Sequence, residues 1–331
     1  MFDLISIGDC VIDTFVPLTD AEIVTSLTSH ETLLGLRSGD KVPVGQSVSM
    51  VAGNAANNAV GASRLQLKTA IYTNVGRLDD DKDDDRIKLK LKKEKVDLRY
   101  VVETDDLPSN HNIILDYKGE RTILVHHQPW KFNLPNLDAT KWVYLTSLAP
   151  SFIDSPLMEQ LVRYLDQTGA KMVFNPGTFQ LKHGVKKYPR ILNSTTLFIV
   201  NLEEAKLILG FNRMEDIAPK KLLKGIADLG PKMVIITDGH KGSFGFDGED
   251  YWKLGIFPTK LKQMTGAGDA YATGALAGIF YGEDLPEAMR WGAANGAAVV
   301  EQIGAQTGLL TYEEMIGRLK QNPEIIAKEL K

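Results

Sequence analysis

A short segment near the C-terminus combines a phosphate-binding pattern with a carboxylate. The run from Thr265 through Gly266, Ala267 and Gly268 to Asp269 leads into a small-residue stretch at 270–276. Small residues let backbone N–H groups approach an anion, and the start of a helix adds partial positive charge. Such a turn suits a transferring phosphoryl group, with Asp269 placed to accept a proton from an attacking hydroxyl. Alternatively, Asp269 only caps the helix.

Two segments in the N-terminal part of the chain offer groups that could bind a polyol. Asp13 follows the first apolar strand, where a carboxylate can accept hydrogen bonds from hydroxyl groups. Gly53 and Asn57 lie at the start of a small-residue helix, and Asn57 provides both a donor and an acceptor. The alternatives are a loop acid that faces water and a closely packed helix start with a buried asparagine.

Two further segments follow apolar strands in the second half of the chain. Asn201 and Glu204 have the spacing of a capping box, and they are also placed to organise water around Mg²⁺ near phosphates. These two interpretations are compatible. Thr237, Gly239 and Gly242 provide a hydroxyl and glycine N–H groups that could contact nucleotide phosphates, or they could form only a strand-to-hairpin turn.

The elements that must position these residues alternate between short apolar strands and amphipathic helices. The predicted strands are Leu4–Ile7, Thr69–Val75, Trp142–Thr146, Lys171–Phe174, Thr196–Val200 and Met233–Thr237. The predicted helices cover 54–65, 83–95, 154–168, 202–209 and 217–229. This alternation predicts an α/β fold, in which a doubly wound, mostly parallel sheet has helices on both faces. Ligands bind such sheets beyond the carboxyl ends of the strands, where most of these residues lie.

Two stretches interrupt the alternation, at about 14–52 and about 98–127. The second contains three predicted strands of a β-meander, Tyr100–Glu103, Asn112–Tyr117 and Arg121–His126, with a turn at 118–120. Together the two stretches predict a small β-sheet inserted as a lid over the site. An edge of that sheet could pair with a second copy, so a homodimer through the lid is one expectation.

Composition limits the class of protein. The chain has 331 residues, of which 44% are hydrophobic and 24% are charged, and its net charge is −4. This charge gives no reason to expect nucleic acid or a membrane as a partner. The single cysteine, Cys10, excludes an intramolecular disulfide. We see neither a signal peptide nor an apolar run of membrane-spanning length, so a cytoplasmic protein is expected.

Taken in order, these segments resemble the ribokinase-like (PfkB) carbohydrate kinase family. The residues that carry the resemblance are Gly8, Asp13, Gly53, Asn57, Asn201, Glu204, Thr237, Gly239, the 266–269 turn, Asn295 and the closing turn at 303–306. The resemblance implies one ribokinase-like kinase domain over residues 1–331, with a β-sheet lid. It also implies transfer of the γ-phosphoryl group of ATP to a hydroxyl of a small sugar or related acceptor.

The resemblance further implies a role for each of these residues. Asp269 would be the base, with an anion hole formed by the backbone of 266–268. The nucleotide and its Mg²⁺ would be contacted by Asn201, Glu204, Thr237, Gly239, Gly242 and Asn295, with Glu204 reaching the metal through water. The acceptor would be held by Asp13, Gly53 and Asn57.

The departures of the chain from the family pattern include Gln263, Met264 and Asn54. Gln263 and Met264 replace the usual Asp-Thr, which counts against a requirement for an activating monovalent cation. Asn54 stands where many relatives have lysine, which counts against a phosphorylated acceptor. A nucleoside acceptor and a non-catalytic sugar- or nucleotide-binding regulator remain alternatives. The segment after Ile7 lacks the Gly-x-Gly-x-x-Gly pattern of Rossmann oxidoreductases.

Overall fold

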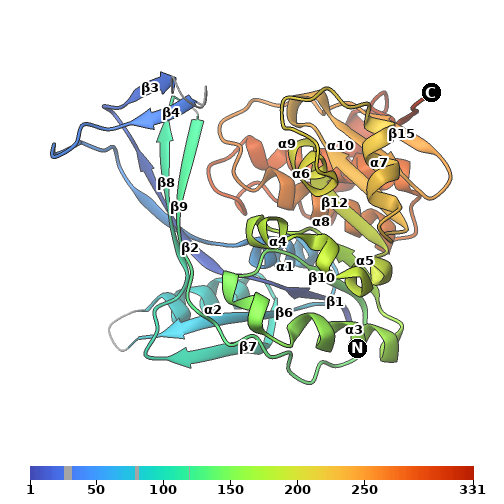
Figure 1. Cartoon of the computed structure of the whole chain (residues 1–331), viewed down its shortest axis with the longest axis horizontal. Helices are drawn as coiled ribbons and strands as arrows, with labels where there is room; N and C mark the ends of the chain where they lie inside the picture. The colour runs from blue at the N-terminus through green and yellow to red at the C-terminus, as the bar shows by residue number, and fades with distance from the viewer. Residues whose placement is uncertain (26–31, 79–81, 119) are drawn as a thin grey trace.

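A computed structural model describes residues 1–25, 32–78, 82–118 and 120–331, and within them the chain is built around one large sheet (Figure 1). The strand order is β16-β15-β14-β13-β12-β11-β10-β1-β6-β7. The strands are β1 (Phe2–Ile7), β6 (Thr69–Arg77), β7 (Asp97–Asp105), β10 (Thr140–Leu145), β11 (Lys171–Phe174), β12 (Leu197–Asn201), β13 (Met233–Thr237), β14 (Ser243–Phe246), β15 (Tyr251–Leu254) and β16 (Lys328–Glu329).

The predicted doubly wound, mostly parallel sheet is confirmed. All six predicted strands are present. The neighbouring strands β7, β6, β1, β10, β11, β12 and β13, in this order across the sheet, pair in parallel. The last three strands, β14 to β16, continue the sheet in antiparallel fashion. The chain extends the sheet from β1 in both directions, so the carboxyl ends of β1 and β10 flank a topological switch point. Ligands bind open α/β sheets at such points.

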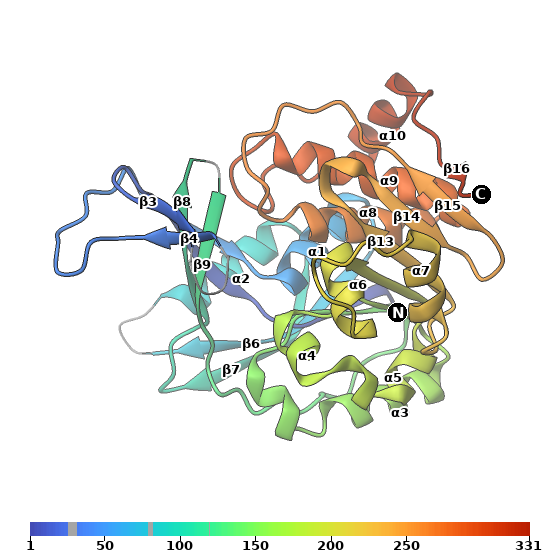
Figure 2. The same cartoon turned by 45° about the horizontal axis from the view of Figure 1, so that its top comes forward.

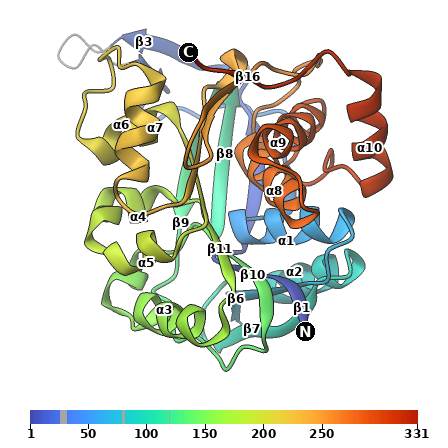
Figure 3. The ribbon, with the colours of Figure 1, turned by 90° about the vertical axis from the view of Figure 1, so that its right-hand side faces the viewer.

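Helices cover both faces of the sheet (Figure 3). They are α1 (Asn54–Arg64), α2 (Asp83–Lys93), α3 (Leu157–Thr168), α4 (Thr178–His183), α5 (Pro189–Ser194), α6 (Leu202–Leu209), α7 (Pro219–Ala227), α8 (Ala267–Phe280), α9 (Leu285–Val300) and α10 (Tyr312–Gln321). Alternate strand residues pack on opposite layers: Phe174 packs with α3 to α7, whereas Val173 packs with α8 to α10. This alternation explains why the strands are short, continuous apolar runs.

A second, four-stranded sheet stands at one end of the large sheet, with strand order β5-β2-β8-β9 (Figures 1 and 2). Its strands are β2 (Val11–Pro17), β5 (Val48–Ala52), β8 (His111–Tyr117) and β9 (Glu120–His126). A separate hairpin of β3 (Glu22–Thr25) and β4 (Thr32–Gly35) extends from it (Figure 2). Residues 26–31 of the predicted insertion, and residue 119 of the predicted turn, lie outside the described residues.

One part of the predicted small sheet is wrong. Residues Tyr100–Glu103, expected as the first strand of the meander, belong to β7 at the edge of the large sheet. Helix α2 connects β6 to β7 as a crossover, which makes β7 parallel to β6. The Tyr100 ring also packs edge-on against Phe2 of β1. The other two strands pair as the predicted hairpin, β8 with β9. The small sheet also recruits β2, which begins three residues before the predicted insertion.

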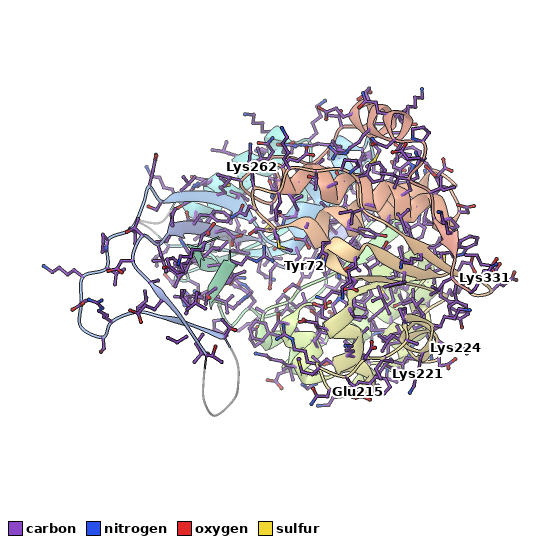
Figure 4. All side chains as sticks on the ribbon, turned by 90° about the horizontal axis from the view of Figure 1, so that it is seen from above. Tyr72, Glu215, Lys221, Lys224, Lys262 and Lys331 are labelled. Atoms are coloured by element: carbon purple, nitrogen blue, oxygen red, sulfur yellow. The ribbon has the colours of Figure 1, made fainter. Side chains whose placement is uncertain are left out.

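Seen from above, the β3–β4 hairpin and the C-terminal residue Lys331 lie at opposite ends of the molecule (Figure 4). Lys224 of α7 lies at the same end as Lys331. None of the helices in the described residues has the length and apolarity that crossing a membrane requires.

Candidate active site

The glycine-rich turn begins helix α8. Gly266 is the N-cap and has φ 81°, a left-handed conformation that glycine adopts without strain. A Cβ at Gly266 would collide with Ala305, whereas a Cβ at Gly268 would meet no atom within 4 Å. Gly266 therefore lets the turn pack against the chain behind it. Gly268 keeps the front of the turn open, as an anion site at a helix start requires.

Asp269, in the first turn of α8, is held by two asparagine amides from α1. Asn54 Nδ2 donates to Asp269 Oδ1 at 2.8 Å, and Asn57 Nδ2 donates to Oδ2 at 2.8 Å. Burial raises the pKa of Asp269, although the two amides and the charge of Arg121 oppose that shift. A carboxylate with a raised pKa and a fixed orientation is suited to act as a general base.

Helix α1 reaches Asp269 because of the backbone at Gly53. This residue is the N-cap of α1, with φ 101°, and a Cβ there would collide with the carbonyl oxygen of Asp9. Its conformation and close packing both require glycine. Gly53 therefore sets the start of α1, from which Asn54 and Asn57 extend to the carboxylate.

Asp269 opens onto a cavity of about 270 Å³ at the carboxyl ends of the parallel strands. The cavity is lined by Asn54, Arg121, Ser147, Asn175, Pro176, Gly177, Thr178, Ile199, Val200, Asn201, Glu204, Thr237, Met264, Gly266, Gly268 and Asp269. Ser147 and Asn175 follow β10 and β11, while Asn201 and Thr237 end β12 and β13. Helices α1, α6 and α8 all begin at this cavity, and their N-termini favour an anionic ligand there.

Charged side chains meet at this cavity from different parts of the fold. Among the described residues that line it, Asp269 and Glu204 are acidic and Arg121 is the one basic residue. Arg121 comes from β9 of the small sheet, and its Nη1 donates to Thr265 Oγ1 at 2.8 Å. This bond links the small sheet to the residue that precedes the glycine-rich turn.

Asp13 lies on β2 of the small sheet, where Asn112 Nδ2 donates to its Oδ1 at 2.9 Å. Burial raises the pKa of Asp13 to about 6, and repulsion from the Asp269 charge acts in the same direction. This repulsion indicates that Asp13, on the small sheet, lies within electrostatic reach of Asp269 in the first turn of α8.

The predicted capping box at the start of α6 is confirmed. Asn201 Oδ1 accepts from the Glu204 backbone N–H at 2.9 Å, and Glu204 Oε2 accepts from the Asn201 N–H at 2.9 Å. Burial raises the pKa of Glu204. No cluster of three or more His, Cys, Asp or Glu side chains suited to a metal occurs in the described part of the chain. Mg²⁺ bound mainly through phosphates and water needs only one or two carboxylates, and Glu204 fits that requirement.

The structure does not bring every predicted site residue to this cavity. Asn295 is fully buried, with its Nδ2 donating to the Ala270 carbonyl and its Oδ1 accepting from the Leu310 N–H. Its amide joins α9 to its neighbours, so the expected nucleotide contact is corrected to a structural role. A Cβ at Gly242 would collide with the Leu254 carbonyl, and Gly239 is exposed in a short 3₁₀ turn. Neither glycine lines the cavity.

Sequence reasoning missed several residues of the cavity. Ser147 and Asn175 follow predicted strands directly, so the same strand-end rule that selected Asn201 could have identified them. Asn54 stands out in the sequence only as a departure from the family pattern, and its bond to Asp269 spans 215 residues. Arg121 lies within a strand and carries no local signal of its role.

Comparison with known proteins identifies one family. The family model described as pfkB family carbohydrate kinase matches residues 10–311. An uncharacterized sugar kinase from Archaeoglobus fulgidus is 26% identical over 258 residues, which cover 76% of this chain and 98% of that protein. A 5-dehydro-2-deoxygluconokinase from Shouchella clausii is 24% identical over 286 residues, covering 80% of this chain and 85% of the relative.

Solved structures share the fold. Arabidopsis thaliana ribokinase, complexed with ribose and ATP, superposes with a TM-score of 0.78 at 20% identity, covering 96% of this chain and 99% of that one. A Burkholderia thailandensis nucleoside kinase in complex with inosine has a TM-score of 0.74 at 20% identity, covering 96% and 98% of the two chains. The large sheet with helices on both faces and a small separate sheet is thus a ribokinase-like fold.

Proposed function

Because the chain belongs to the pfkB family of carbohydrate kinases, we propose that it transfers the γ-phosphoryl group of ATP to a hydroxyl of a small sugar or sugar-like acceptor. The observation that carries this proposal is the arrangement around Asp269. Two amides hold the carboxylate in the first turn of α8, and the glycine-rich turn opens onto the same cavity. Phosphoryl transfer depends mainly on such positioning and on charge stabilisation.

In the proposed reaction, Asp269 accepts the proton of the acceptor hydroxyl while the oxygen of that hydroxyl forms a bond to the γ-phosphorus. The bond between that phosphorus and the β,γ-bridging oxygen breaks, and ADP leaves with the electron pair. In this proposal the backbone N–H groups of residues 266–268 would stabilise the charge that develops on the phosphoryl oxygens. Gly266 and Gly268 line the cavity, whereas the Ala267 N–H donates to the Met264 carbonyl oxygen at 3.3 Å and would have to leave it. The open front of Gly268 leaves space for that group.

The donor side of the cavity is suited to a nucleotide with its metal. When bound, Mg²⁺ neutralises charge on the phosphates. Glu204, with Asn201 beside it, would hold water on that ion, and Thr237 presents a hydroxyl to the phosphates. Asn201 and Glu204 can serve both this role and their capping box, because the cap bonds use Asn201 Oδ1 and Glu204 Oε2 and leave Asn201 Nδ2 and Glu204 Oε1 for other partners.

The acceptor would lie between the two sheets, with Asp13 accepting hydrogen bonds from its hydroxyl groups and the second hydrogen of Asn57 Nδ2 donated to one of them. Asp13 belongs to the small sheet and Asn57 to α1 beside the large sheet. We therefore assign the strands β2, β5, β8 and β9 the role of a lid within one kinase domain over residues 1–331. A lid over this cavity would exclude water from the phosphoryl group.

Arg121 supplies a cation from this lid to the phosphoryl side of the cavity. Its bond to Thr265 places it next to the glycine-rich turn. In an Arg121→Gln variant we expect kcat to fall on the order of 10²-fold, because one preorganised donor to developing charge is lost. ADP affinity, measured by calorimetry, should change little. An unchanged kcat would remove Arg121 from the mechanism.

The activity is tested with ADP release as the readout and a panel of acceptors: free sugars that include ribose, 5-dehydro-2-deoxygluconate, and nucleosides that include inosine. One acceptor from the sugar group should stimulate ADP release in the presence of ATP and Mg²⁺. Stimulation by nucleosides alone would replace the sugar acceptor with a nucleoside. Tight binding of a sugar or of ATP without ADP release on any acceptor would instead indicate a non-catalytic regulator.

A further inference from the structure

The turn that follows α9 contacts the catalytic segments at three successive residues. The Gly304 N–H donates to Gln263 Oε1 at 2.8 Å, just before the glycine-rich turn. Ala305 packs against Gly266, where a Cβ would collide with it. Gln306 Nε2 donates to Asn57 Oδ1 at 3.0 Å. This turn, residues 304–306, is therefore placed to control the geometry of the base.

The hydrogen bonds around Asn57 have only one consistent direction. The ionised carboxylate of Asp269 accepts hydrogen bonds and cannot donate them, so Asn57 must present its Nδ2 to that group. This orientation leaves Asn57 Oδ1 facing Gln306, which must then provide a donor. Both amides are almost fully buried, with Asn57 4% and Gln306 5% exposed, so water does not readily replace either partner.

The backbone of Gln306 is held in place by Arg64. Arg64 Nη1 donates to the carbonyl oxygens of Gln306 and Leu309, each at 3.0 Å. The same guanidinium group forms a two-point ion pair with Glu94, at 2.9 and 2.8 Å. Because Arg64 ends α1, the helix that carries Asn57 also anchors the turn that orients Asn57.

We propose that Gln306 is a positioning residue for phosphoryl transfer: its side-chain amide locks Asn57 in the orientation that holds Asp269 Oδ2. This proposal rests on the proposed function of Asp269 as the base. Without the donor from Gln306, Asn57 Oδ1 is left buried and unpaired, and that bond no longer opposes rotation of the Asn57 amide. Rotation would turn its oxygen toward the carboxylate and remove one of the two bonds that orient the base.

The decisive variant is Gln306→Glu, which preserves side-chain shape but, when ionised, presents oxygens alone to Asn57. We expect kcat to fall 10- to 100-fold, while the affinity for ADP stays within about twofold of the parent. The acid limb of the kcat profile should move to higher pH, because Asp269 loses a hydrogen bond that favours its ionised form and also meets the like charge of the new carboxylate. A matched control is Gln302→Glu, an exposed glutamine that precedes the same turn.

A double-mutant cycle separates positioning from general damage to the fold. In an Asn57→Ala background, Gln306→Glu should have little further effect on kcat, since Gln306 acts through Asn57. Equal, additive effects in both backgrounds would overturn the proposal. Gln306→Met keeps the side-chain length without a charge, and its kcat should lie between those of the parent and of Gln306→Glu.

A second measurement does not depend on turnover. Titration of the Asp269 carboxyl carbon by ¹³C NMR should give a higher pKa in Gln306→Met, which adds no charge, than in the parent, with Gln302→Glu unchanged. An unaltered Asp269 titration would refute the coupling, whether or not any acceptor is found. If the titration shifts but the parent phosphorylates no acceptor, the positioning network stands and the proposed function fails.

Discussion

Replacing Asp269 with asparagine removes the base while keeping the shape of the side chain. The parent carboxylate accepts one amide hydrogen bond on each oxygen, from Asn54 and Asn57, both at 2.8 Å. In Asp269→Asn one of these oxygens becomes an NH₂ group that faces another donor, which costs about 1–3 kcal/mol in a buried site. The variant therefore alters both the chemistry and the local hydrogen bonding.

The effect of this substitution on folding should nevertheless be small. Burial raises the pKa of Asp269, so at neutral pH the folded state carries a charge that it disfavours relative to the unfolded chain. Neutral asparagine removes that penalty, which offsets the lost hydrogen bond. We expect the thermal midpoint at pH 8 to stay within a few degrees of the parent, as an exposed control, Asp250→Asn, should also do.

The effect on the reaction should be large. A positioned general base contributes about 10²- to 10⁴-fold, so kcat should fall by that factor, or about 3–5 kcal/mol of activation free energy. The assay is ADP release at saturating ATP and acceptor, with ATP affinity measured separately by calorimetry. A kcat near the parent value in a folded, ATP-binding Asp269→Asn protein would refute the assignment of the base. Loss of ATP binding would instead point to a structural role.

Three further predictions concern other parts of the site. Asp13→Asn should stabilise the fold at pH 8 by roughly 3 kcal/mol, because the neutral amide avoids burying a charge. This advantage should disappear as the pH falls from about 6 to 4, where the parent carboxyl becomes protonated. Thermal unfolding at several pH values measures the difference in stability, and a difference that does not change with pH would contradict the prediction. Gly268→Ala should fold normally, because no atom lies within 4 Å of the added Cβ, yet lower kcat by filling the open front of the turn; unchanged kcat would mean that the phosphoryl group does not bind there. Asn295→Leu should destabilise the protein by about 1–3 kcal/mol, since the Leu310 N–H and the Ala270 carbonyl lose their partner. The KM for ATP should stay the same. A large rise in that KM would show that Asn295 does contact the nucleotide.

Much of the scaffold could be predicted because its signals are local. Short apolar runs identify the parallel strands, since a strand buried on both faces needs apolar residues at successive positions. The Asn201–Glu204 capping box depends on residues three positions apart, so its geometry follows from the sequence alone. The glycine-rich turn before Asp269 is local for the same reason, because it needs only a left-handed residue at the start of a helix.

What only the tertiary structure decided is which distant residues meet. Asn57 reaches Asp269 across 212 residues of sequence, and Arg121 reaches Thr265 across 144, because the order of strands and the placement of the small sheet bring them together. Asn295 shows the converse: its residue type suits a ligand, but packing between helices uses both ends of its amide. Local patterns specify elements and turns through nearby atoms. The partners of the base depend on contacts that form only when the whole sheet is assembled.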